Sequence, residues 1–68
     1  MASPESTGNG EIYVEFIVQG SFVKVTAIDS KSGTEASVLG PSGAPRGALT
    51  DAAVRKLNYM LSKSRDEA

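Results

Sequence analysis

The chain has 68 residues, a net charge of −1, and neither cysteine nor histidine. This length allows one domain at most. The composition excludes disulfides, thiolate nucleophiles, imidazole bases and the usual zinc or iron ligand sets, and the small net charge excludes a global pull toward nucleic acid or membranes.

The first ten residues, MASPESTGNG, are small and polar, so a disordered tail is predicted over residues 1–10. They lack the basic and apolar stretches of a secretion signal. No apolar run in the chain approaches the roughly 20 residues that cross a bilayer. We therefore expect a cytoplasmic protein without membrane contact, with one folded domain over residues 11–63 and a second disordered tail over residues 64–68.

Two segments rich in β-branched and aromatic residues predict an antiparallel hairpin, namely EIYVEFIVQ at residues 11–19 and FVKVTAID at residues 22–29. The turn between them has two candidate positions. Gly20-Ser21 suits a type II′ turn, whereas Gln19-Gly20 would set Glu15 opposite Lys24. Both positions put the same side chains on the same faces of the sheet.

A third strand is predicted from Thr34 to Leu39, after a turn that Asp29 opens and Gly33 closes with a left-handed backbone. The stretch Gly40-Pro41-Ser42-Gly43 is predicted to end this strand, because glycine and proline are typical of turns.

The residues that follow, up to Lys63, predict a helix, because apolar side chains recur along one stripe of a 3.6-residue period. The start of this helix is open between two positions. Pro45 is favourable in a first turn, and Thr50 followed by Asp51 makes an alternative cap.

Together these elements predict an α+β fold. It is a three-stranded antiparallel β-meander, strand order 1-2-3, with one C-terminal helix packed on one face (β-β-β-α). Alternation along the strands and the apolar stripe of the helix select the core. The core residues are Val14, Phe16, Val23, Val25 and Val38 on the sheet, and Leu49, Ala53, Leu57, Met60 and Leu61 on the helix.

The helix covers only one face of this sheet, and the other face carries large apolar side chains among charged ones. These form the candidate partner face: Tyr13, Ile17, Phe22, Ile28 and Leu39. Ordering roughly 50 residues costs about 75 kcal/mol, and burying the apolar side chains returns about 70 kcal/mol. Association is therefore a natural further source of stability. We expect a homodimer or an unknown protein partner, bound at this face or at a sheet edge; the alternative is a monomer that tolerates scattered exposed apolar groups.

The charge along the chain is uneven. From residue 44 to residue 65 there are five cations and one acid, Asp51. Tyr59 has Arg55 and Lys63 four residues away on either side, an arrangement that can hold single-stranded nucleic acid or a phosphate. The candidate anion or nucleic-acid patch consists of Arg46, Arg55, Lys56, Tyr59 and Lys63. The alternative is an ordinary surface cation–π pair between Arg55 and Tyr59.

Catalysis is not expected. The available nucleophiles are serine, threonine, tyrosine and lysine, and none stands beside a recognisable base or in a Gly-x-Ser-x-Gly motif. The eight acidic residues are scattered, without the spacing of a calcium loop. We therefore expect a non-catalytic domain without a cofactor or a metal.

The stretch VKVTAIDSKSGTEASVLGP at residues 23–41 is followed by Ala44-Pro45-Arg46 and then by Val54-Arg55-Lys56-Leu57. In this order the segments resemble a family of short uncharacterised bacterial proteins. Its pattern has a strand ending A-I-D, a turn with S/T-G-T-E, a strand ending V-G-P and a helix bearing R-K-L. The resemblance covers residues 11–62 and implies no activity, cofactor or binding residue.

Overall fold

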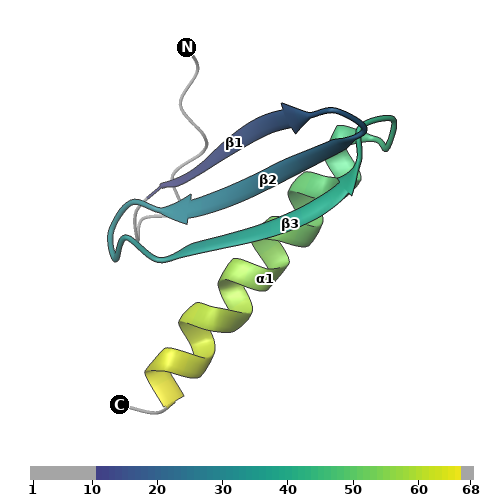
Figure 1. Ribbon diagram of the computed structural model, residues 1–68. Coiled ribbons are helices and arrows are strands. Elements are labelled where there is room, and N and C mark those ends of the chain that lie inside the picture. The colour runs from purple at the N-terminus through teal and green to yellow at the C-terminus, as the bar shows by residue number, and fades with distance from the viewer. Residues whose placement is uncertain (1–10, 67–68) are drawn as a thin grey trace.

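The computed structural model describes residues 11–66, which form a three-stranded antiparallel sheet followed by one helix (Figure 1). The elements are β1 (Ile12–Gln19), β2 (Phe22–Asp29), β3 (Glu35–Pro41) and α1 (Arg46–Asp66). The strand order is β1-β2-β3. The predicted β-β-β-α fold is confirmed. The tail predicted over residues 1–10 lies outside the described residues, as do residues 67–68.

The hairpin between β1 and β2 turns at Gly20-Ser21. Gln19 pairs with Phe22, and Gly20 has a φ of 61°, the left-handed value that the first turn position of a type II′ turn requires. Glu15 consequently faces Thr26. The alternative turn at Gln19-Gly20, which would have set Glu15 opposite Lys24, is wrong.

The turn between β2 and β3 forms as its residue types predict. The backbone N–H and the hydroxyl of Ser32 donate to the Asp29 carboxylate, at 3.0 and 2.7 Å. Gly33 has a φ of 78°. The Asp29 side chain therefore opens the turn, and a left-handed glycine closes it.

Strand β3 runs further than the sequence predicts. Gly40 and Pro41 continue the strand, opposite Val23 and Phe22, instead of ending it. Two physical reasons explain the difference. Leu49 lies so close to Gly40 that a side chain there would collide with it, and Pro41 sits on an outer strand, where a missing N–H breaks no ladder bond.

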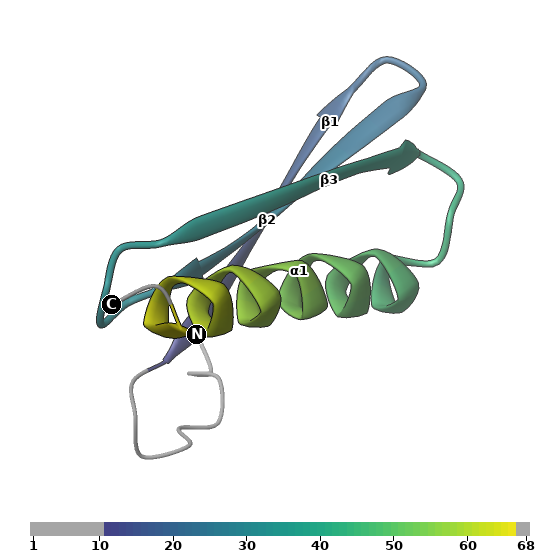
Figure 2. The ribbon, with the colours of Figure 1, turned by 90° about the horizontal axis from the view of Figure 1, so that it is seen from below.

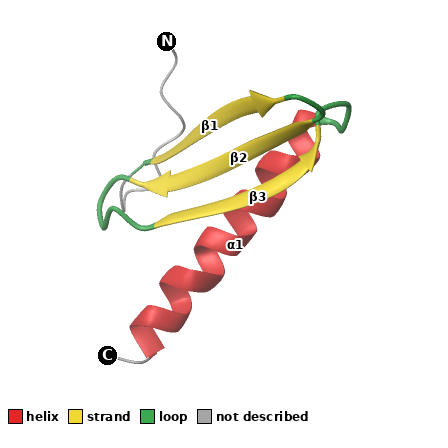
Figure 3. Cartoon of the chain, in the orientation of Figure 1, coloured by secondary structure: helices red, strands yellow, loops and turns green. Residues whose placement is uncertain are grey.

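Helix α1 begins at Arg46, directly after Pro45, so the earlier of the two candidate starts is correct. The helix continues to Asp66, beyond the predicted end at Lys63 and into the segment expected to be a disordered tail. The helix crosses beneath β2 and β3, and β1 lies at the side of the sheet away from it (Figures 2 and 3).

The core lies between the sheet and the helix. The buried apolar residues are Val23, Val25, Ala27, Ala36, Ala53 and Leu57, and the partly buried ones around them are Ile12, Val14, Phe16, Val38, Leu49, Val54, Met60 and Leu61. All ten predicted core residues are among these fourteen. In the described part of the chain, no helix combines the length and the apolar character needed to span a bilayer.

Candidate functional site

The helix-free face of the sheet, which we call the outer face, carries all five residues of the candidate partner face. Tyr13 and Ile17 alternate outward along β1, Phe22 and Ile28 along β2, and Leu39 along β3. The strand register does not join them into one surface. Instead, it divides them into two apolar groups at opposite ends of the sheet.

The first group lies near the β1–β2 turn and consists of Ile17, Phe22 and Leu39. Ile17 and Leu39 flank Lys24 in one row across the sheet, and Phe22 lies two residues from Lys24 on the same face. Their side chains are 44%, 58% and 70% exposed. This is the larger exposed apolar group of the outer face.

The second group is smaller and pairs Tyr13 with Ile28 across β1 and β2. The Tyr13 hydroxyl donates a hydrogen bond of 2.6 Å to Oε1 of Glu11. This hydrogen bond, and secondly the negative charge of Glu11, raise the pKa of Tyr13 above its usual value, because both favour the protonated phenol. The group therefore has a polar rim.

A polar row separates the two groups. Glu15, Thr26 and Ser37 lie side by side across the three strands. The hydroxyls of Thr26 and Ser37 are 2.8 Å apart and share a hydrogen bond. Thr26 is buried although α1 lies on the other face, and its place on the central strand gives it a neighbouring strand on both sides.

One exposed apolar residue was not predicted as part of a site. Val18 lies on the helix side of β1, yet it is 55% exposed. The reason is the position of the helix, which packs against β2 and β3. Strand alternation identifies the face of a residue, but it does not show how far along that face a helix reaches.

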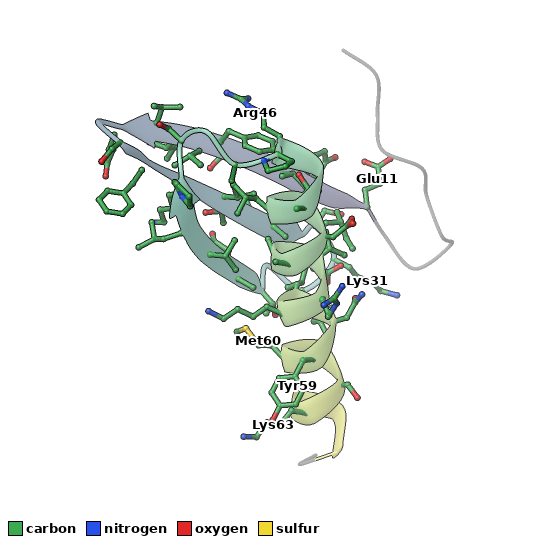
Figure 4. All side chains as sticks on the ribbon, turned by 90° about the vertical axis from the view of Figure 1, so that its right-hand side faces the viewer. Glu11, Lys31, Arg46, Tyr59, Met60 and Lys63 are labelled. Atoms are coloured by element: carbon green, nitrogen blue, oxygen red, sulfur yellow. The ribbon has the colours of Figure 1, made fainter. Side chains whose placement is uncertain are left out.

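The basic residues of the candidate anion patch are not brought together. Arg46 is at the beginning of α1, and its guanidinium lies 4.8 Å from the centre of the Phe16 ring on β1. Figure 4 shows Arg46 at one end of the helix and Tyr59 with Lys63 toward the other. Thirteen residues of helix separate Arg46 from Tyr59 by about 20 Å.

Lys56 is also engaged with the sheet, because its ammonium donates a hydrogen bond of 3.0 Å to the carbonyl oxygen of Ser37. Arg55, Tyr59 and Lys63 remain as neighbours at four-residue spacing, and Tyr59 is 65% exposed. Within residues 11–66, no three side chains of the acidic, histidine or cysteine types are placed to hold a metal ion together.

Comparison with known protein families shows which family this chain belongs to. Residues 9–64 match DUF6898, a domain of unknown function, and the match spans more than half of the chain. The chain belongs to the DUF6898 family. The expectation of an uncharacterised domain family is confirmed to that extent. No curated protein and no solved structure matches this DUF6898 chain significantly.

Proposed function

We propose that this DUF6898 domain is a non-catalytic protein-interaction domain that associates with a second copy of itself through its β-sheet. The observation that carries the proposal is the one-sided cover of the sheet. Ile17, Phe22 and Leu39 are between 44% and 70% exposed on the face opposite the helix. Grouped apolar side chains of this size favour contact with a protein surface.

The small size of the chain and of its core supports the same proposal. Its 68 residues contain no cysteine, so no disulfide supplements the core. Six apolar residues of the described part are buried, and three of them are alanine. Domains of this size bury a small share of their surface, and association is a common way to bury more. The absence of histidine and cysteine from the sequence supports a non-catalytic role.

Sedimentation equilibrium tests the proposal on the full chain, between about 10 μM and about 1 mM protein. We expect the average mass to rise with concentration from that of the 7.1 kDa monomer toward twice that value. The rise should persist at high salt, because apolar contacts do not weaken as salt is added. A constant monomer mass over the whole range would contradict self-association.

An alternative is that the chain binds nucleic acid or another anion through Arg55, Tyr59 and Lys63. The exposed Tyr59 ring between two cations favours this alternative. Titration with single-stranded RNA or DNA at low salt should then shift the NMR signals of Arg55 and Tyr59, and the shifts should disappear as salt rises. Unmoved signals would remove the alternative.

A further inference from the structure

The two outer edges of the sheet differ in whether another strand can pair with them. Just before β3, the Thr34 carbonyl accepts a hydrogen bond from the Asp29 N–H, and just after β3, the Ser42 N–H donates one to the Ser21 carbonyl. Bonded residues alternate along an antiparallel pair. The backbone groups of β3 that point away from β2 therefore belong to Glu35, Ser37, Leu39 and Pro41.

Two features protect this β3 edge. Lys56 donates its 3.0 Å hydrogen bond to the outward carbonyl of Ser37, across the place where an incoming strand would lie. Pro41 has no N–H to offer. Lysine and proline at an edge are recognised devices against strand addition.

Among residues 11–66, nothing comparable protects the β1 edge. The Glu11 carbonyl accepts a hydrogen bond from the Ser30 N–H, so odd-numbered residues of β1 bond to β2. The outward N–H and C=O groups consequently belong to the even-numbered residues, which are Ile12, Val14, Phe16 and Val18. The strand sequence IYVEFIVQ contains neither lysine nor proline, and its single charge is Glu15.

An incoming strand would also cover exposed apolar surface. Val18 is 55% exposed on the helix side of β1, beyond the part of the sheet that α1 covers. A strand beside β1 would place its own side chains next to Val18 and Phe16. Pairing at this edge would thus satisfy outward backbone groups and bury apolar surface together.

We propose that two copies of the chain pair antiparallel through β1, which forms one continuous six-stranded sheet. This inference rests on the self-association proposed above and places the contact at the β1 edge, which includes Ile17 of the outer-face group and leaves Phe22 and Leu39 outside the contact. We assign the incoming strand to a second copy of the chain because two β1 strands are complementary to each other. Both are apolar on the helix side, and a two-fold axis sets the outward N–H groups of each copy opposite the outward C=O groups of the other.

The register follows from charge. Outward even-numbered residues must face one another, which leaves two registers with the longest overlap. One centres on Glu15 and sets the two carboxylates directly opposite each other, which is destabilising. The other centres on Phe16. It pairs Val14 with Val18 of the partner subunit, and Glu15 with Ile17 of the partner subunit. The register centred on Phe16 is therefore favoured.

Two matched substitutions test the edge. Val18→Lys places a charge at the proposed interface, opposite Val14 of the partner subunit, whereas Leu39→Lys makes the same charge change on the outer face. Both native side chains are more than half exposed, so both variants should fold, which circular dichroism can check. We expect Val18→Lys to weaken the dimer about tenfold or more and Leu39→Lys to leave its dissociation constant nearly unchanged.

Other results separate the two proposals. Weakening by Leu39→Lys alone, or equal weakening by both variants, would overturn the edge pairing and leave self-association through the sheet face in place. A wild-type chain that stays monomeric would overturn the proposed function, and the edge pairing with it.

Cross-linking tests the register independently, because the chain has no cysteine of its own. In the register centred on Phe16, residues 15 and 17 of opposite copies form a non-hydrogen-bonded pair with Cα atoms about 4.5 Å apart, within disulfide range. A mixture of the Glu15→Cys and Ile17→Cys variants should form the mixed disulfide dimer on oxidation. A mixed disulfide between the Tyr13→Cys and Ile17→Cys variants would overturn this register, because these residues face each other only in the register centred on Glu15 and both variants keep the Glu15 carboxylate.

Discussion

At the scale of single residues, Gly40 shows how a glycine can be required without any special backbone angle. It lies inside β3, is buried, and pairs with Val23. A Cβ atom at this position would lie 2.6 Å from Cδ2 of Leu49. The missing side chain therefore lets the first turns of α1 approach the sheet.

We expect Gly40→Ala to lower the free energy of unfolding by about 1 kcal/mol, because the terminal methyl groups of Leu49 must shift to admit the added methyl group. Urea denaturation measures the change. Gly43→Ala is the matched control, since no atom lies within 4 Å of the added Cβ and Gly43 has no positive φ. In a Leu49→Ala background, Gly40→Ala should lower the free energy of unfolding by less. An equal loss of stability in both backgrounds would show that contact with Leu49 is not the cause.

At the scale of elements, the strands are linked across the outer face by the hydroxyl pair of Thr26 and Ser37. The oxygen atoms are 2.8 Å apart, and Thr26 is 6% exposed. Within the described residues, no buried side-chain oxygen or nitrogen lacks a hydrogen-bond partner. The pair thus connects β2 to β3 in a part of the sheet that has no apolar cover.

Thr26→Val keeps the shape of the side chain and removes its hydroxyl. We expect a loss of about 1 kcal/mol in the free energy of unfolding, because the Ser37 hydroxyl then lacks its partner in a half-buried position. Adding Ser37→Ala to this variant should lower the free energy of unfolding little further, since it removes the Ser37 hydroxyl that has lost its partner. Thermal or urea unfolding of the two single variants and the double variant gives the coupling energy; strictly additive losses would contradict the linkage.

The elements themselves could be predicted from the sequence because their signals are local. Alternation over residues 11–29 and the helical stripe around Leu57 each lie within one segment, and both faces were assigned correctly. The turn position was harder, because Glu15 opposite Lys24 is an attractive pair that competes with Gly20-Ser21. The positive φ of Gly20 shows that the turn backbone decided the register.

Features that depend on where the helix crosses the sheet could not be predicted. Periodicity places Lys56 beside Tyr59 on the helix surface, but only the crossing position brings its ammonium to the Ser37 carbonyl. The same holds for Arg46, which reaches the Phe16 ring, and for Val18, which the helix leaves exposed. The candidate basic patch was therefore divided by tertiary contacts that no single segment encodes.

At the scale of the whole molecule, the asymmetry of the sheet is the central feature. One face is covered by α1, and one edge is obstructed by Lys56 and Pro41. Within the part of the chain that the structure describes, the outward backbone groups of β1 have no strand beside them. A strand edge without lysine or proline is a template for another strand. In a closed two-fold dimer each β1 edge covers the other, so the assembly ends at two chains instead of growing.

Pairing of this kind makes thermal stability depend on protein concentration, because dilution favours the separated chains. Each tenfold rise in concentration adds about 1.4 kcal/mol per dimer, which corresponds to a rise in Tm of roughly 5 °C for a dimer of this size. Differential scanning fluorimetry over several concentrations measures the slope. Leu39→Lys should keep the slope, and Val18→Lys should move it to protein concentrations about tenfold higher or more. A wild-type Tm that does not move with concentration would show that folding and association are not coupled in this chain.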